Sequence, residues 1–423
     1  MLRVTLQLND TQRDNIKVCQ RVTLLSTISF SVIYPGLWFY LHELGVNTVF
    51  YGVVIGGFEL GKMLASPLMA YLMRHGYRRL LLGSILLTVL ASLVYVAANQ
   101  IWFIFALRLV QGLGAGNNVI LQTYVNLHSP VHKRTKMLAK LNRANALGAM
   151  LGSLIGAALA FVPDFTIVNR VIIGPAITGL FTALCQLVAL TIILASFTEP
   201  VVDEIKTVND DSSDEEGTSY ADTFHYVSWR HSTMRLVVLA SVYFFICVIA
   251  SVYETLVIPI SHNMFSWNRF QISLLWAGIS LIWYLTYLAL GNLSKRVTDT
   301  PLALTGLVLQ TLGLVGLLRY HDLFTKWQFL AATPVLMIGL SLSLVIIDSV
   351  YSKDLATNEM GKMMSILLAA GGLARSVAPA TLSYVYHAYG QNHVFIILSG
   401  FAGVALIGFI LLQVIFQIAK ENF

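Results

Sequence analysis

Five ionisable residues lie inside long apolar stretches of this 423-residue sequence, namely Glu59, Lys62, Arg108, Glu254 and Arg375. A charge inside the hydrocarbon layer of a membrane is energetically costly. We therefore expect such a side chain to bind or move ions and small solutes. The chemistry suggested is reversible electrostatic binding, in which no bond of the bound molecule is made or broken.

Two of these charges are close in sequence, and two others are at similar depth. Glu59 and Lys62 are three residues apart, so a helix places them on one face, as a functional pair or as a self-neutralised structural pair. We count the depth of Arg108 and Glu254 from the lumenal (non-cytoplasmic) ends of their predicted helices, at about 1.5 Å per residue. Each lies roughly 10–12 Å below the lumenal surface of the membrane. We predict that Arg108 pairs with Glu254 as a lumenal gate or anion-coupled site. The alternative is that Arg108 binds backbone carbonyls of its own half.

The remaining charges are more isolated. Arg375 lies near the middle of its apolar stretch without an acidic neighbour, so we predict that it attracts an anionic substrate. The alternative is that it satisfies carbonyl groups freed by Pro379. Asp348 lies near the end of another stretch and is expected to contact Lys353 or water in a structural role.

No constellation for covalent chemistry accompanies these charges. The sequence has no P-loop, no metal-ligand spacing and no credible nucleophile arrangement. Cys19, Cys185 and Cys247 are too scattered for a disulfide framework or a zinc site, and we expect them to be buried apolar residues. The sequence therefore predicts no catalysis, no metal and no cofactor.

The elements that must position these charges are membrane helices. The chain is 57% hydrophobic and 11% charged, whereas soluble proteins have roughly 25% charged residues. This composition excludes a water-soluble enzyme, and runs of about 20 apolar residues recur from end to end. We predict an all-α integral membrane protein with twelve transmembrane helices in two six-helix bundles. The spans are 20–42, 48–73, 79–98, 101–125, 138–162, 170–196, 233–261, 267–292, 301–318, 328–350, 362–388 and 393–417.

The basic residues of the short loops indicate the orientation. Lys and Arg accumulate in alternate loops, which are cytoplasmic by the positive-inside rule. These residues are Arg74, Arg78, Arg79, Lys133, Arg134, Lys136, Lys295, Arg296 and Lys353. An even number of spans places both termini in the cytoplasm. The net charge of +6 therefore reflects the membrane topology rather than binding to nucleic acid. We expect the partners to be a lipid bilayer and a small molecule or ion, and the protein to be a monomer.

An acidic stretch separates the two halves. Nine acidic residues and one basic residue, Lys206, lie between Glu199 and Asp222. Such a segment cannot bury enough apolar surface to offset the entropy of ordering it. We predict a cytoplasmic tail at 1–19, a first bundle at 20–198, a cytoplasmic linker at 199–232, a second bundle at 233–418 and a cytoplasmic C-terminus at 419–423.

Small residues and prolines recur in corresponding spans of the two halves. Transporters built from internal repeats show this pattern, and small residues also let membrane helices approach closely. The candidates for bending and packing are Pro35, Gly112, Gly148, Gly152, Gly156, Pro259 and Pro379.

The segment RLVQGLGAGNN at 108–118 carries a known motif, Arg-x-x-Gln-Gly-x-Gly, at Arg108, Gln111, Gly112 and Gly114. The chain thereby resembles the major facilitator superfamily. Its loop motif, Gly-x-Leu-x-Asp-Arg-x-Gly-Arg-Arg, is matched in part after the second and eighth spans. The matches are Arg74, Gly76, Arg78 and Arg79 in the first copy, and Gly291, Leu293 and Arg296 in the second. The resemblance implies that these loops gate the cytoplasmic side, although Met73 and Lys295 replace the acidic residue of the motif.

Five further stretches narrow the resemblance, at 58–70, 108–117, 133–152, 253–267 and 367–390. They resemble the lysosomal subfamily of major facilitator superfamily domain-containing protein 8, also called ceroid-lipofuscinosis neuronal protein 7. The resemblance implies an endolysosomal membrane protein, for which both transporter and chloride-channel activities have been proposed. The lysosomal placement rests on the resemblance only.

The expected function is transport of a small solute by alternating access, with an anion as one candidate for the solute. Proton coupling could involve Glu59 or Glu254. One alternative is an anion- or chloride-conducting channel, which Arg108 and Arg375 would favour. A second alternative is a non-transporting scaffold whose acidic linker recruits partners.

Overall fold

The computed structural model describes residues 10–96, 98, 100–129, 133–159, 161, 165–167, 170–172, 174–199, 221–319, 326–355 and 360–421. The first half contains α1 (Asp10–Glu43), α2 (Thr48–Leu72), the short helix η1 (Met73–His75), α3 (Tyr77–Tyr95), α4 (Ile101–Gly114), α5 (Asn117–Leu127), α6 (Arg134–Leu159) and α7 (Gly174–Ser196). A small antiparallel hairpin, β1 (Phe165–Ile167) and β2 (Arg170–Ile172), precedes α7. The second half contains α9 (Ala221–Phe265), α10 (Arg269–Leu293), α11 (Asp299–Gly316), α12 (Lys326–Lys353), α13 (Met360–Tyr389) and α14 (Gln391–Glu421).

The twelve predicted membrane crossings are confirmed. Among the described residues, ten helical stretches are long and apolar enough to span a bilayer, and α4 and α5 together form one of them. The other two crossings are α6 and α11, which lack a window of that hydropathy. In α6 the cause is a polar first half, which includes Lys140, Asn142 and Asn145.

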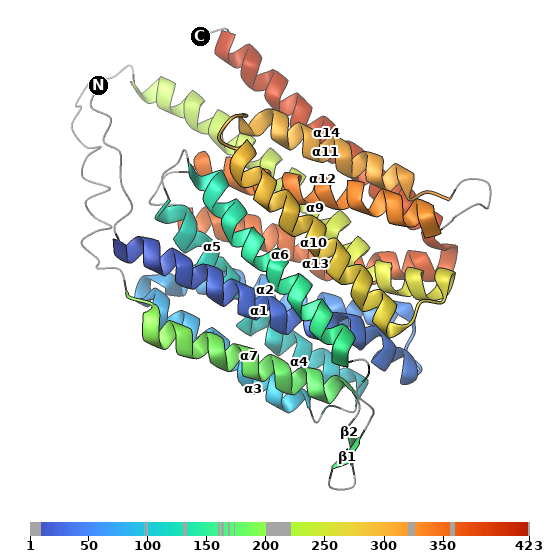
Figure 1. The fold of residues 1–423 in the computed structure, drawn as a ribbon. Coiled ribbons are helices and arrows are strands. Elements are labelled where there is room, and N and C mark those ends of the chain that lie inside the picture. Colours follow the sequence, from blue (N-terminus) through green and yellow to red (C-terminus); the bar gives the residue numbers. More distant parts are fainter. Residues whose placement is uncertain are drawn as a thin grey trace.

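The two halves meet along two long interfaces. Helix α2 packs against α13, and α6 packs against α10. In Figure 1, α3 and α7 form one edge of the molecule, and α11 and α14 form the other. Helices α1 and α2 therefore lie near the centre with α9, α10, α12 and α13. We call the side where α1 begins and α14 ends the terminal face, and the other side the opposite face.

Glycines allow the central helices to approach closely. A Cβ atom at Gly112 would lie 2.0 Å from the carbonyl oxygen of Phe58, and one at Gly56 would lie 2.2 Å from that of Ser376. Real Cβ atoms do not make such contacts, so no larger residue fits at these crossings. The three glycines predicted to pack in α6 face α1, where a Cβ at Gly148 would lie 2.5 Å from the Leu24 carbonyl. Gly152 and Gly156 follow on the same face of α6, against Ile28 and Val32 of α1. The three prolines predicted to bend helices lie inside α1 (Pro35), α9 (Pro259) and α13 (Pro379).

Two helices begin earlier than the sequence predicted. Helix α1 starts at Asp10, within the predicted tail, because the buried Asn15 side chain donates to the Tyr124 hydroxyl and to the Thr198 carbonyl, each at 2.8 Å. Helix α9 starts at Ala221, within the predicted linker. The rest of that linker, 200–220, lies outside the described residues.

Candidate functional site

A cavity of about 340 Å³ lies between the two halves. Helices α1, α2, α3, α4, α5, α6 and α7 contribute its lining from the first half, and α9, α10, α12 and α13 from the second. Every charged residue singled out at the start, Glu59, Lys62, Arg108, Glu254 and Arg375, lines this one cavity, as does Gln111. The structure thus brings together residues that are up to 316 positions apart in the sequence, from 59 to 375.

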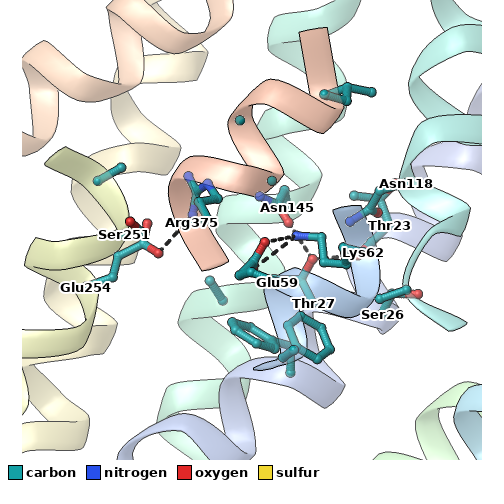
Figure 2. Close-up of a pocket in the computed structure, with 18 of the residues that line it drawn as sticks. Thr23, Ser26, Thr27, Glu59, Lys62, Asn118, Asn145, Ser251, Glu254 and Arg375 are labelled. Carbon is teal, nitrogen blue, oxygen red and sulfur yellow. Dashed lines mark hydrogen bonds and ion pairs between the residues drawn. The ribbon is translucent and has the colours of Figure 1, made fainter. Parts of the chain in front are cut away.

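Four of these side chains form a row of alternating charge. Lys62 Nζ lies 3.0 Å from Glu59 Oε2 on α2, and Arg375 Nη1 lies 3.1 Å from Glu254 Oε2, joining α13 to α9. Figure 2 shows the order Glu254, Arg375, Glu59, Lys62 across the cavity, from the second half into the first. Each carboxylate in the row therefore has a cationic partner within salt-bridge distance.

The predicted pairing of Arg108 with Glu254 is wrong for this structure, because Arg375 binds Glu254 instead. Arg375 has no acidic neighbour in the sequence, but the fold gives it one on the adjacent helix α9. Depth along a helix can be counted from sequence, whereas the direction in which a side chain points depends on how the helix is rotated against its neighbours.

Arg108 lies on α4 and is 1% exposed. Its Nη1 donates to Gln111 Oε1 at 3.1 Å, and Gln111 Nε2 donates in turn to Ser92 Oγ at 3.2 Å. The guanidinium also lies over the ring of Phe58, 4.8 Å from its centroid. Arg108 Nε and Nη2 are buried and have no hydrogen-bond partner among the described residues. A buried guanidinium with two free donors is suited to bind an anion.

Polar groups extend the cavity beyond the charged row. Thr27 of α1 donates to Asn145 of α6 at 2.5 Å beside Lys62, and Asn118 lines the same side (Figure 2). On the other side, Tyr34 of α1 meets Trp276 of α10 edge to face, with ring centroids 5.1 Å apart. The cavity therefore combines a charged centre with aromatic and amide walls.

One lining residue was misjudged from the sequence. Asp348 of α12 was expected to contact Lys353 or water, but it is 3% exposed, lines the cavity and accepts a hydrogen bond from Gln122 of α5. This bond joins the two halves. Its position near a helix end had suggested contact with solvent, but the packing of α12 against helices of both halves, together with the Gln122 bond, excludes solvent from it.

Further bonds join the halves at the terminal face. The hydroxyl oxygens of Thr135 on α6 and Ser349 on α12 are 2.7 Å apart. Lys353 Nζ donates to Thr135 Oγ1 at 2.8 Å and to Asp299 Oδ2 at 2.5 Å. At the opposite face, the rings of His42 on α1 and His262 on α9 lie 5.8 Å apart. The cavity is thus bordered by contacts between the halves toward both faces.

The two loop motifs differ in their contacts. In the first copy, Glu199 accepts hydrogen bonds from the backbone N–H groups of Tyr77, at 2.6 Å, and Arg78, at 2.9 Å. This carboxylate occupies the N-terminal end of α3, where the helix dipole favours a negative charge. Gly76 adopts φ +119°, which favours glycine, and Arg78 donates to the Leu194 carbonyl at 2.6 Å. A carboxylate from just after α7 thus lies at this loop, where Met73 replaces the acidic residue of the motif.

The second copy is more open. A Cβ atom at Gly291 would contact nothing within 4 Å, and Lys295 and Arg296 are exposed. Arg79 of the first copy is also exposed, and the Arg74 side chain lies outside the described residues.

Replacing Glu199 with alanine should lower stability, because two N–H groups at the start of α3 lose their acceptor. We expect a loss of about 1 kcal/mol, by analogy with the removal of helix caps. Thermal unfolding of the purified protein in detergent measures it, with Glu43→Ala at the exposed end of α1 as the matched control. Equal unfolding midpoints for the two variants would contradict the capping role.

Comparisons with known proteins agree with this architecture. The sequence matches the model of the Major Facilitator Superfamily over residues 22–379. It is 25% identical to major facilitator superfamily domain-containing protein 8 of Xenopus laevis, over 93% of this chain and 89% of that protein.

Two solved structures share the fold. The human organic anion transporter MFSD10 (TETRAN) superposes with a TM-score of 0.71 at 16% identity, over 94% of this chain and 99% of that chain. The proton:xylose symporter XylE bound to 6-bromo-6-deoxy-D-glucose gives a TM-score of 0.74 at 14% identity, over 95% of each chain. At these identities the likeness shows the fold alone.

Proposed function

Since this chain belongs to the Major Facilitator Superfamily, we propose that it moves a small anionic solute across a membrane by alternating access, with the central cavity as the binding site. The observation that carries the proposal is Arg108, a fully buried cation with two donors free among the described residues and no carboxylate bound to it. A buried cation of this kind gains stability from an anionic partner.

The neighbouring cations favour an anion rather than a cation. Lys62 and Arg375 already hold Glu59 and Glu254, so those two acids are occupied, whereas an incoming anion finds Arg108 without a carboxylate among the described residues. A volume of about 340 Å³ is near the lower limit of roughly 300–1,000 Å³ for small-molecule sites, which supports a small solute. One structural neighbour, MFSD10, transports organic anions, and this agrees with the proposal.

Arg108→Gln should lower the uptake of small organic anions at least about tenfold, because hydrogen bonds to a charged group contribute roughly 1.5–3 kcal/mol. Purified protein in proteoliposomes is assayed with radiolabelled benzoate, succinate and phosphate, while pH and chloride are varied independently. Arg108→Lys keeps the charge and should retain part of the uptake.

The exposed Arg21 on α1 provides the matched control, since Arg21→Gln removes a cation that does not line the cavity. Undiminished anion uptake by Arg108→Gln would contradict the proposal. Chloride currents that follow the electrochemical gradient without saturation would favour a channel, and no flux of any kind would favour a scaffold.

For the setting, we propose that the terminal face is cytoplasmic and that the protein resides in an endolysosomal membrane. The basic residues of the loops at the terminal face support the orientation. The compartment is supported by the sequence resemblance described above. Protease protection of tagged termini, and co-localisation of the tagged protein with lysosomal markers, test the two points separately.

A further inference from the structure

We propose that Asp348 is a proton-binding site, and that its hydrogen bond to Gln122 couples proton binding to closure of the terminal face. The inference rests on the proposed function in one respect, since the proton is taken to move together with the anion. Its first test below requires no transport.

The three acidic residues that line the cavity differ in their partners. Glu59 has Lys62 at 3.0 Å and Glu254 has Arg375 at 3.1 Å. Asp348 has neither a lysine nor an arginine within 4.0 Å among the described residues. Its Oδ2 accepts from the Gln122 amide, and its Oδ1 is buried without a hydrogen-bond partner in the described part of the chain. Asp348 is thus the cavity carboxyl without a compensating charge.

Among the described residues, no cation of the helices around Asp348 forms a salt bridge with it. On its own helix, Lys353 binds Asp299 of α11, and on α13 Arg375 binds Glu254. Gln122 of α5 and Tyr243 of α9 face Asp348, and the other helices of this cavity that pack against α12 carry Arg134 on α6 and Tyr287 on α10. Of these, Arg134 donates to the backbone carbonyl of Ser352, and the others are neutral.

A buried carboxylate without a cation is strongly disfavoured, and binding a proton removes the charge. The protonated acid also gains an O–H donor. In the closed terminal face Asp348 is therefore expected to hold a proton. When α12 separates from α5, the Gln122 bond breaks, water reaches the carboxyl group, and the proton is released on that side as the carboxylate becomes hydrated.

The charge of the cavity then links the proton to the anion. With Asp348 neutral, the lining carries three cations, Lys62, Arg108 and Arg375, against two carboxylates. With Asp348 ionised, cations and carboxylates are equal in number. A proton on Asp348 thus favours an anion in the cavity, and an anion favours the proton to the same extent, because coupling between two sites is reciprocal. The arrangement is that of a proton–anion symporter.

Infrared difference spectroscopy between alkaline and acidic pH tests the proton site directly. The wild type should show the carbonyl band of a buried carboxylic acid that forms as pH falls, and Asp348→Asn should lack that band. Glu254→Gln is the matched control and should retain it, since Glu254 is held as a carboxylate by Arg375. An unchanged band in Asp348→Asn would overturn the proposal.

Binding of benzoate tests the coupling. In the wild type, affinity should change by up to about tenfold per pH unit, with proton uptake on binding, and in Asp348→Asn by less than about twofold. Gln122→Leu leaves the carboxyl group in place without the link between halves, so it should keep the infrared band. Equal pH dependence in the wild type and Asp348→Asn would overturn the coupling. Should the wild type bind no anion, the proposed function fails, and the infrared band still decides whether Asp348 binds a proton.

Discussion

Arg375→Ala is expected to abolish transport, because it leaves Glu254 without its cation inside the cavity. The pair is 3.1 Å long, and its side chains are only 22% and 18% exposed. Removing one partner of a buried pair costs roughly 3–5 kcal/mol, and the partial exposure here suggests the lower limit. A cost of about 3 kcal/mol corresponds to a loss of more than a hundredfold in an equilibrium constant.

A double-mutant cycle separates this pair from the other possible partner of Glu254. Transport by Glu254→Gln, Arg375→Gln and the double variant should be strongly non-additive, because each single variant already removes the interaction. The corresponding cycle with Arg108→Gln should be close to additive. Strong coupling between Glu254 and Arg108, without coupling to Arg375, would contradict the pairing seen in Figure 2.

A disulfide across the terminal face should stop transport completely. The hydroxyl oxygens of Thr135 and Ser349 are 2.7 Å apart on helices of different halves, so cysteines at these positions can bring their sulfur atoms within bonding distance. The bond would prevent α6 and α12 from separating, and alternating access requires one bundle to move against the other. We expect oxidation of Thr135→Cys/Ser349→Cys to remove more than about 90% of uptake, and a reducing agent to restore it.

The experiment needs a background without the native Cys19, Cys185 and Cys247, which are buried. The matched control is Gly316→Cys/Ala332→Cys, within the second half, where the Cβ atoms would lie 3.1 Å apart. This cross-link joins α11 to α12 and should leave transport intact. Full activity of the oxidised Thr135–Ser349 variant would show that the terminal face does not have to open.

The sequence predicted the membrane helices well but not their limits. Mean hydropathy and length are local properties, so the crossings could be counted without tertiary information. The extension of α1 to Asp10 depends on Asn15 contacting Tyr124 and Thr198, which are more than one hundred residues away. Similarly, the polar half of α6 is tolerated because it faces the cavity rather than lipid, as Asn142 and Asn145 show.

The residues of the candidate site were predictable from the sequence, but the contacts between them were not. Charge inside an apolar stretch is visible in the sequence, and for that reason Glu59, Arg108, Glu254 and Arg375 could be selected as candidates. The pair within a single helix, Glu59 and Lys62, follows from helical periodicity alone. Asp348 was given a structural role because its main contact, Gln122, lies on α5 of the other half and cannot be read from the sequence.

The sequence by itself therefore determined the class of protein, the membrane helices and the charges that lie between them. These follow from the cost of placing polar groups in hydrocarbon, which acts on each segment independently. The tertiary structure decided which polar groups meet: Arg375 with Glu254, Gln122 with Asp348, and Arg108 with no acid in the described part of the chain. Those choices depend on the rotation and packing of helices from different parts of the chain, where contacts such as Gly56 against Ser376 set how closely the two halves approach.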